Sequence, residues 1–203
     1  MAKNLIPGLL ISLLFAGEPE FCRCQAQEST ESKAASLEIG FARTNLKDGV
    51  YPGMAGHYLF FLTKSLGTGF ALASYQNYST NTFGYPLSNP QMLISQYGWI
   101  NQWLPVHFKL IKLKLSLNTG LIQARLFDDT QRYYNGQLNF QQETIREFFC
   151  FIQPSADLSL RLFGPVHLTA GANYRFAGGK SHFTPATAFK APGYFLGLTV
   201  IAE

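Results

Sequence analysis

The chain has 203 residues, of which 47% are hydrophobic and only 14% charged, so it fits one domain or two small ones and carries less charge than an ordinary soluble domain. The formal net charge is +4 and the basic residues are scattered, so the sequence does not indicate nucleic-acid binding. Aromatic residues reach 15%, which favours strands and membrane interfaces over a helical bundle. Because no run of eighteen apolar residues follows the N-terminal segment, a membrane-spanning form would have to be a closed β-barrel.

The N-terminal segment has the organisation of an export signal. Lys3 supplies a positive charge, residues 5–16 form an apolar stretch, and Cys24-Gln25-Ala26 offers small residues before a cleavage point. We therefore expect cleavage after Ala26. The alternative is an N-terminal amphipathic or buried helix.

The expected cleavage divides the chain into three parts. We expect residues 1–26 to be the signal peptide, residues 27–35 a flexible polar lead-in, and residues 36–203 the folded domain. The two cysteines of the signal leave with it, so Cys150 stands alone and a disulfide framework is excluded. Its apolar neighbours indicate a small filler of the fold.

Eight segments after the lead-in read as strands. They lie near 36–44, 54–64, 68–78, 98–111, 113–127, 146–162, 165–177 and 193–202. The alternation is clearest from Val166 to Phe176, where apolar residues occupy the even positions and mostly polar ones, His167 to Arg175, the odd positions. In the fourth segment Leu104 and Val106 are expected to share the apolar face. The fifth loses its phase near Gly120, which predicts a bulge there.

The connections between these segments alternate in length. Long connections are predicted at 45–53, 79–97, 128–145 and 178–192, and very short ones lie between them. Outer-membrane barrels have short periplasmic turns and longer extracellular loops. The sequence therefore predicts an all-β fold, an eight-stranded antiparallel up-and-down transmembrane β-barrel with both ends of the chain on the periplasmic side.

The polar side chains of the strands should face the lumen. An eight-stranded barrel is just wide enough for side chains to fill, so a structural ion-pair network is expected inside. Its predicted members are Glu38, Lys109, Lys114, Asp157, Arg161 and Arg175. Other polar residues expected to point inward are His107, Asn118, His167 and Asn173. The alternative is a narrow passage that repels cations.

Aromatic side chains near the strand ends fit the girdles that mark membrane edges. This predicted set is Tyr75, Tyr78, Trp99, Phe148, Tyr174, Phe176 and Tyr194.

Four stretches resemble the PorT-type outer-membrane β-barrel family. They are Trp103–Leu110, with its Leu-Pro-apolar run, Leu115–Leu121, Gly171–Phe176 and Gly193–Leu198. The resemblance spans roughly residues 36–202. It implies a small eight-stranded outer-membrane barrel from a family in which most members have no assigned activity and a few relatives serve protein secretion or adhesion.

No catalytic, cofactor-binding or metal site is predicted. The histidines lack metal-ligand spacing, and residues 178–181 lack the preceding glycine and following helix of a phosphate loop. A lipid A hydrolase would need a nucleophile beside a histidine, for which Ser181-His182 and Ser74 with His57 are the candidates.

The predicted function is a structural or interaction role in the cell envelope, without catalysis or cofactor. The expected partners are outer-membrane lipid and, through the outward loops, envelope or secretion proteins, with no nucleic acid. One alternative is a soluble lipocalin-like barrel that binds a hydrophobic ligand. The other is an outer-membrane lipid A hydrolase.

Overall fold

A computed structural model describes residues 34–47, 49–79, 89–108, 110–128, 133–134, 137–138, 143–180 and 185–202. The expected signal peptide and lead-in, apart from its last two residues, therefore lie outside the described residues, as do Cys22 and Cys24. Within the described ranges, no helix is long and apolar enough to cross a membrane.

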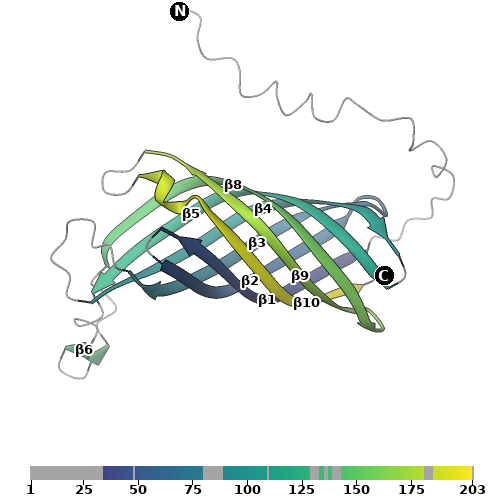
Figure 1. Cartoon of the computed structure of the whole chain (residues 1–203), viewed down its shortest axis with the longest axis horizontal. Coiled ribbons are helices and arrows are strands. Elements are labelled where there is room, and N and C mark those ends of the chain that lie inside the picture. The colour runs from purple at the N-terminus through teal and green to yellow at the C-terminus, as the bar shows by residue number, and fades with distance from the viewer. Residues whose placement is uncertain are drawn as a thin grey trace, which may run out of the picture. The chain divides into compact units, whose positions relative to one another are not determined.

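Eight antiparallel strands form a closed barrel in which each strand pairs with its neighbours along the chain and the last pairs with the first (Figure 1). These strands are β1 (Ala35–Leu46), β2 (Gly49–Phe61), β3 (Leu66–Tyr78), β4 (Pro90–His107), β5 (Ile111–Asp128), β8 (Glu143–Phe163), β9 (Val166–Gly178) and β10 (Ala191–Ala202). Two short strands, β6 (Tyr133–Tyr134) and β7 (Gln137–Leu138), pair only with each other between β5 and β8. The fold is thus the predicted eight-stranded up-and-down barrel.

The two-residue periodicity places side chains alternately on the two faces of the wall. In β9, His167, Thr169 and Arg175 are buried inside, whereas Tyr174 and Phe176 are exposed outside. The apolar face of this strand therefore points out of the barrel.

Two strands begin five or more residues earlier than the sequence predicted. β4 begins at Pro90 and β2 at Gly49, so the expected long loop 45–53 is a hairpin with only residues 47 and 48 between the strands. Gly53 reads as a turn residue but lies in the wall, where an added Cβ would overlap the backbone of Ser74. This glycine allows two strands to approach closely.

The predicted bulge at Gly120 is wrong. Gly120 pairs in regular register with Gly98 on one side and Phe151 on the other. Ile122 and Leu126 continue the inward face that carries Lys114. The register is regular on both sides from Leu115 to Leu126, and the inward side chains change from polar to apolar along this stretch.

A bulge occurs instead in β4, between Trp103 and Val106. Leu104 keeps the inward phase of Gln102 and is buried, and the bulge turns Val106 to the outer face. The expectation that these two residues share a face is therefore wrong. Pro105, which has no N–H to donate to a ladder, lies at this bulge.

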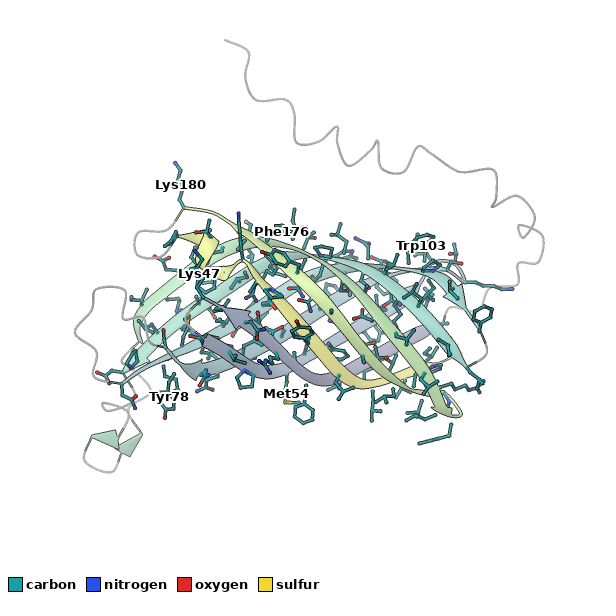
Figure 2. The ribbon with its side chains drawn as sticks, in the orientation of Figure 1. Lys47, Met54, Tyr78, Trp103, Phe176 and Lys180 are labelled. Carbon is teal, nitrogen blue, oxygen red and sulfur yellow. The ribbon has the colours of Figure 1, made fainter. Side chains whose placement is uncertain are left out.

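The barrel has two unlike ends. At one end, called here the turn end, residues 62–65, 108–110 and 164–165 join the strands. At the other, the loop end, lie residues 79–89, 129–142 and 179–190, the last containing the 3-10 helix η3 (Ala186–Phe189), together with the 47–48 hairpin. Figure 2 shows Lys47, Tyr78 and Lys180 at the loop end and Trp103 toward the turn end. At the turn end, Gly164 takes a φ of +49°, a left-handed conformation that favours glycine.

Candidate functional site

The outer wall is apolar all the way round. Each of the eight strands contributes at least one large apolar or aromatic side chain that is 44–56% exposed. One from each strand is Ile39, Tyr58, Leu72, Tyr97, Leu117, Leu158, Phe176 and Leu196. We call this exterior the apolar belt. Soluble monomers rarely expose a contiguous apolar surface of more than a few hundred Å².

Six of the seven aromatic residues predicted for the membrane edges are exposed on the outer face, but one of these six, Trp99, lies in the middle of β4 and not near a strand end. Tyr78, Trp99, Phe148, Tyr174, Phe176 and Tyr194 are exposed on the outer face. Trp99 packs edge-on against Phe60 and Phe70, with ring centroids 6.2 and 4.6 Å away. Tyr75 is instead 4% exposed inside the lumen, because it shares the inward phase of Ala71 on β3. Cys150 is also exposed on the outer face of β8.

Toward the turn end, the lumen holds a buried charged cluster. Lys114 Nζ donates to Glu38 Oε2 at 2.5 Å, and Thr199 Oγ1 donates to the same oxygen at 2.6 Å. His57 Nδ1 lies 3.1 Å from Glu38 Oε1. Lys114 Nζ also donates to Thr169 Oγ1 at 3.1 Å. Two opposite charges are thus held inside the wall with several hydrogen bonds satisfying them.

Asp157 belongs to the same layer of the lumen. It lies opposite Lys114 in the register of β5 and β8, and its Oδ2 accepts a hydrogen bond from Ser155 at 3.3 Å. A Cβ on Gly171 would overlap this carboxylate, so the absence of a side chain on β9 makes room for it.

The structure does not bring two other predicted network residues, Arg161 and Arg175, to this cluster. Arg161 is exposed at the turn end, where its Nε donates to the Gly164 carbonyl at 2.8 Å. Arg175 is buried toward the loop end. Lys109 lies outside the described residues.

Between the two halves of the lumen lies a small cavity of about 30 Å³ with both polar and apolar lining residues. His57, Gln96, Asn118, Gln153 and Asp157 are among its lining residues. This volume has room for about two water molecules.

The loop-side half of the lumen is apolar. It contains the larger buried cluster of the barrel, in which Ile94, Ile122 and Phe149 are 0–1% exposed. Phe189 of η3 inserts into this cluster, with its ring centroid 4.8 Å from that of Phe149. This apolar half of the lumen was not predicted from the sequence, although Ile122 and Leu126 share the even phase of Lys114 and indicated it.

Arg175 connects η3 to the barrel wall through hydrogen bonds. Its Nε donates to the Phe189 carbonyl at 2.8 Å, and its Nη2 donates to Thr44 Oγ1 at 3.2 Å. Its guanidinium carbon lies 5.9 Å from the centre of the Tyr75 ring. Arg175 therefore helps to close the loop end instead of joining the Glu38 cluster.

The catalytic candidates do not assemble in the described part of the chain. Ser74 is exposed on the outer face of β3, whereas His57 points into the lumen and pairs in register with Ala71. The backbone wall separates the two side chains. Ser181 and His182 lie outside the described residues. Among the residues described, no group of three or more His, Cys, Asp and Glu side chains is placed to hold a metal ion.

The chain is similar in fold to several solved outer-membrane proteins. Ail, the attachment invasion locus protein of Yersinia pestis, has 13% sequence identity and a TM-score of 0.53, with 85% of this chain and 100% of that one covered. Neisserial surface protein A has 13% identity and a TM-score of 0.53, with coverage of 84% and 96%. The outer membrane protein OprG of Pseudomonas aeruginosa has 8% identity and a TM-score of 0.51, with coverage of 86% and 98%. No family model and no curated protein matches the sequence.

Proposed function

We propose that this chain is an outer-membrane β-barrel that crosses the bilayer with its eight strands and has a structural or interaction role in the cell envelope, without catalysis. The observation that carries the proposal is the inverted arrangement of the wall. The charged pair Glu38–Lys114 is buried inside, while the apolar belt encircles the outside. Only a hydrocarbon surrounding makes an exterior of this kind favourable.

The belt argues against the soluble lipocalin-like alternative. A soluble barrel of that class keeps apolar faces inside and polar faces toward water. Exposed residues such as Phe41, Phe70 and Leu198 lie on the outer faces of three different strands, which water would disfavour.

An interaction role is supported by the loop end and by the neighbours in fold. By their names, Ail is an attachment invasion protein and the neisserial neighbour is a surface protein. Side chains fill the lumen, and so we favour a role in binding partners through the loops over a role as a channel for solutes. The partners we propose are outer-membrane lipid and envelope or secretion proteins.

Three finer assignments belong to the same proposal. The stretches Trp103–Leu110 and Gly171–Phe176 support membership of the PorT-type family. The signal pattern supports export with cleavage after Ala26, so the mature N-terminus should be Gln27 by mass spectrometry. We also propose that Glu38, Lys114 and Asp157 stabilise the lumen as one unit, with Arg161 and Arg175 acting at its two ends.

Fractionation of the producing cells tests the proposal. The chain should sediment with the outer membrane, resist extraction by alkaline carbonate, and dissolve only in detergent. On a gel run without boiling, the folded barrel should migrate differently from the boiled chain. Recovery of the mature chain from a detergent-free periplasmic extract would reject the membrane assignment.

A further inference from the structure

The connections at the turn end carry strongly exposed apolar side chains. Leu62 belongs to the 62–65 connection, Phe108 and Leu110 to the 108–110 connection, and Phe163 ends β8 just before the third. These four side chains are 61–70% exposed, and among the large apolar residues that the structure describes only Phe41 is more exposed. We call these four residues the turn tips.

The turn tips continue the outer face of the wall. At the end of β2, Leu62 follows the outward Phe60 in the same two-residue phase. Past the bulge at the end of β8, Phe163 pairs with Val166, which lies on the outer face because its neighbour His167 points into the lumen. On these strands the apolar belt therefore runs on to the turns without a polar border.

The backbone of the turns is tied to the neighbouring strands. Three N–H groups donate to carbonyls at 2.8 Å: Leu62 to Leu66, Phe108 to Ile111, and Arg161 to Leu110. Hydrocarbon offers no hydrogen-bond partner, so a turn at the edge of an apolar layer is tolerated only where its backbone groups are paired. The turn end meets this requirement at these positions.

Toward the loop end, the outward apolar residues give way to polar ones. Ser74, Ser95 and Gln123 lie side by side on the outer faces of β3, β4 and β5 in the register of the sheet. The outward residues next to this row on its turn side are apolar and about half exposed: Leu72, Tyr97 and Leu121. The row marks the edge of the belt in this sector.

The length of strand between this row and the turns indicates how deep the turn end lies. β5 has twelve residues there, 111–122, and β3 has eight, 66–73. A tilted strand needs about 9–11 residues to cross the hydrocarbon of a bilayer. The hydrocarbon therefore takes up the wall as far as the turns and leaves no polar margin on that side.

We propose that the turn tips are lipid anchors, which insert among the acyl chains of the leaflet at the turn end, just below its headgroups. In the orientation proposed above, this is the inner leaflet, on the periplasmic side. The continuity of the tips with the belt favours lipid over a protein partner at this end. Lys64 lies in the same connection as Leu62, and its long side chain can reach the headgroup layer from there. The inference rests on the proposed membrane-spanning function.

Tryptophan fluorescence of variants folded into phosphatidylcholine vesicles tests the anchors. With both native tryptophans replaced (W99F/W103F), the change L62W, F108W or F163W places the only tryptophan at one tip, and the matched control K180W places it at the loop end. We expect lipids brominated near the headgroup to quench the three tip variants, while iodide on both sides of the membrane has little effect. K180W should show the reverse.

Trp99, kept alone in the variant W103F, is the reference for the belt and should respond to deeper bromines than the tip variants do. The anchors would be overturned if iodide quenches the tip variants as strongly as K180W and brominated lipids do not, while Trp99 still responds to bromines. The turn end would then stand in water, where its apolar tips could meet a periplasmic protein. Stronger quenching of the tip variants by deep bromines than by shallow ones would overturn their placement below the headgroups.

Folding of each variant is checked by the gel shift between unboiled and boiled samples. The three tips are tested in separate variants, so a failure of one to fold leaves the other two to decide. Absence of bromine quenching at Trp99 as well would count against the membrane-spanning barrel itself. Loss of quenching confined to the tip variants would count against the anchors alone.

Discussion

At the scale of single residues, the central feature is a charged pair inside an apolar exterior. Glu38 is 2% exposed and Lys114 is 3% exposed. The outward-facing residues of their strands, β1 and β5, belong to the apolar belt. Burying either charge alone would be unfavourable, because desolvation costs several kcal/mol per ion. The hydroxyls of Thr169 and Thr199 and the imidazole of His57 complete the hydrogen bonding. The pair is therefore stable only while both partners are present.

This pair gives the first prediction. Glu38→Ala leaves the Lys114 ammonium buried without its carboxylate, which should lower the free energy of unfolding by about 3–5 kcal/mol. Urea unfolding of the barrel in lipid vesicles measures the change. The control Lys64→Ala, at the exposed turn, should cost less than about 0.5 kcal/mol. The double change Glu38→Gln with Lys114→Met should recover much of the loss, and equal effects of the two single alanine variants would contradict the account.

At the scale of elements, strand periodicity was the reliable signal. β1 and β9 alternate strictly, and their inward and outward faces were predicted correctly. The prediction failed where one face is not uniformly polar. β5 keeps its register past Gly120 while its inward residues change from Lys114 to Ile122 and Leu126, which looks like a lost phase in the sequence.

The remaining errors have two physical sources. Glycine and proline occur in the strands of the wall as well as in turns. For this reason the start of β2 at Gly49 was predicted too late in the sequence. Contacts between distant segments leave no local pattern, and so the packing of Phe189 against Phe149 and its link to Arg175 were not predicted. The eight-strand fold was thus readable from the sequence, while the composition of the loop-side lumen required the structure.

The packing of η3 gives a second prediction. Phe189 is 2% exposed in the lumen, so Phe189→Ala should leave a cavity and cost about 3–5 kcal/mol of unfolding free energy. The matched change Phe176→Ala removes a ring from the outer face, where lipid chains can replace it, and should cost markedly less. Urea unfolding in vesicles compares the two. A larger loss for Phe176→Ala would show that the two faces have been assigned the wrong way round.

At the scale of the whole molecule, the barrel is asymmetric along its axis. The turn end has short connections and a polar lumen, whereas three of the four connections at the loop end are longer and its lumen is apolar and closed by η3. In an outer-membrane orientation the longer loops face outward. The lengths of the connections and the composition of the lumen therefore distinguish the two ends of the barrel.

This asymmetry predicts the pattern of proteolysis. Lys180 and Lys190 are exposed at the loop end, whereas Lys64 is exposed at the turn end. Trypsin added to intact cells should cut at Lys180 or Lys190, because exposed loop residues are preferred cleavage sites. Lys64 should remain intact until the outer membrane is opened. Peptide mass spectrometry identifies the cuts, and cleavage at Lys64 in intact cells would invert the topology.

The central claim is that the belt faces lipid, and the fluorescence of the two tryptophans tests it most directly. Trp99 and Trp103 are the two tryptophans of the sequence, and both are exposed on the outer face of β4. In vesicles of lipids brominated on their acyl chains, the fluorescence of both should be strongly quenched, and aqueous iodide should have little effect. They are four positions apart, about 13 Å along the strand, so the variant retaining only Trp99 should respond to deeper bromines than the variant retaining only Trp103. Efficient quenching by iodide with none by the brominated lipids would contradict the membrane-spanning barrel.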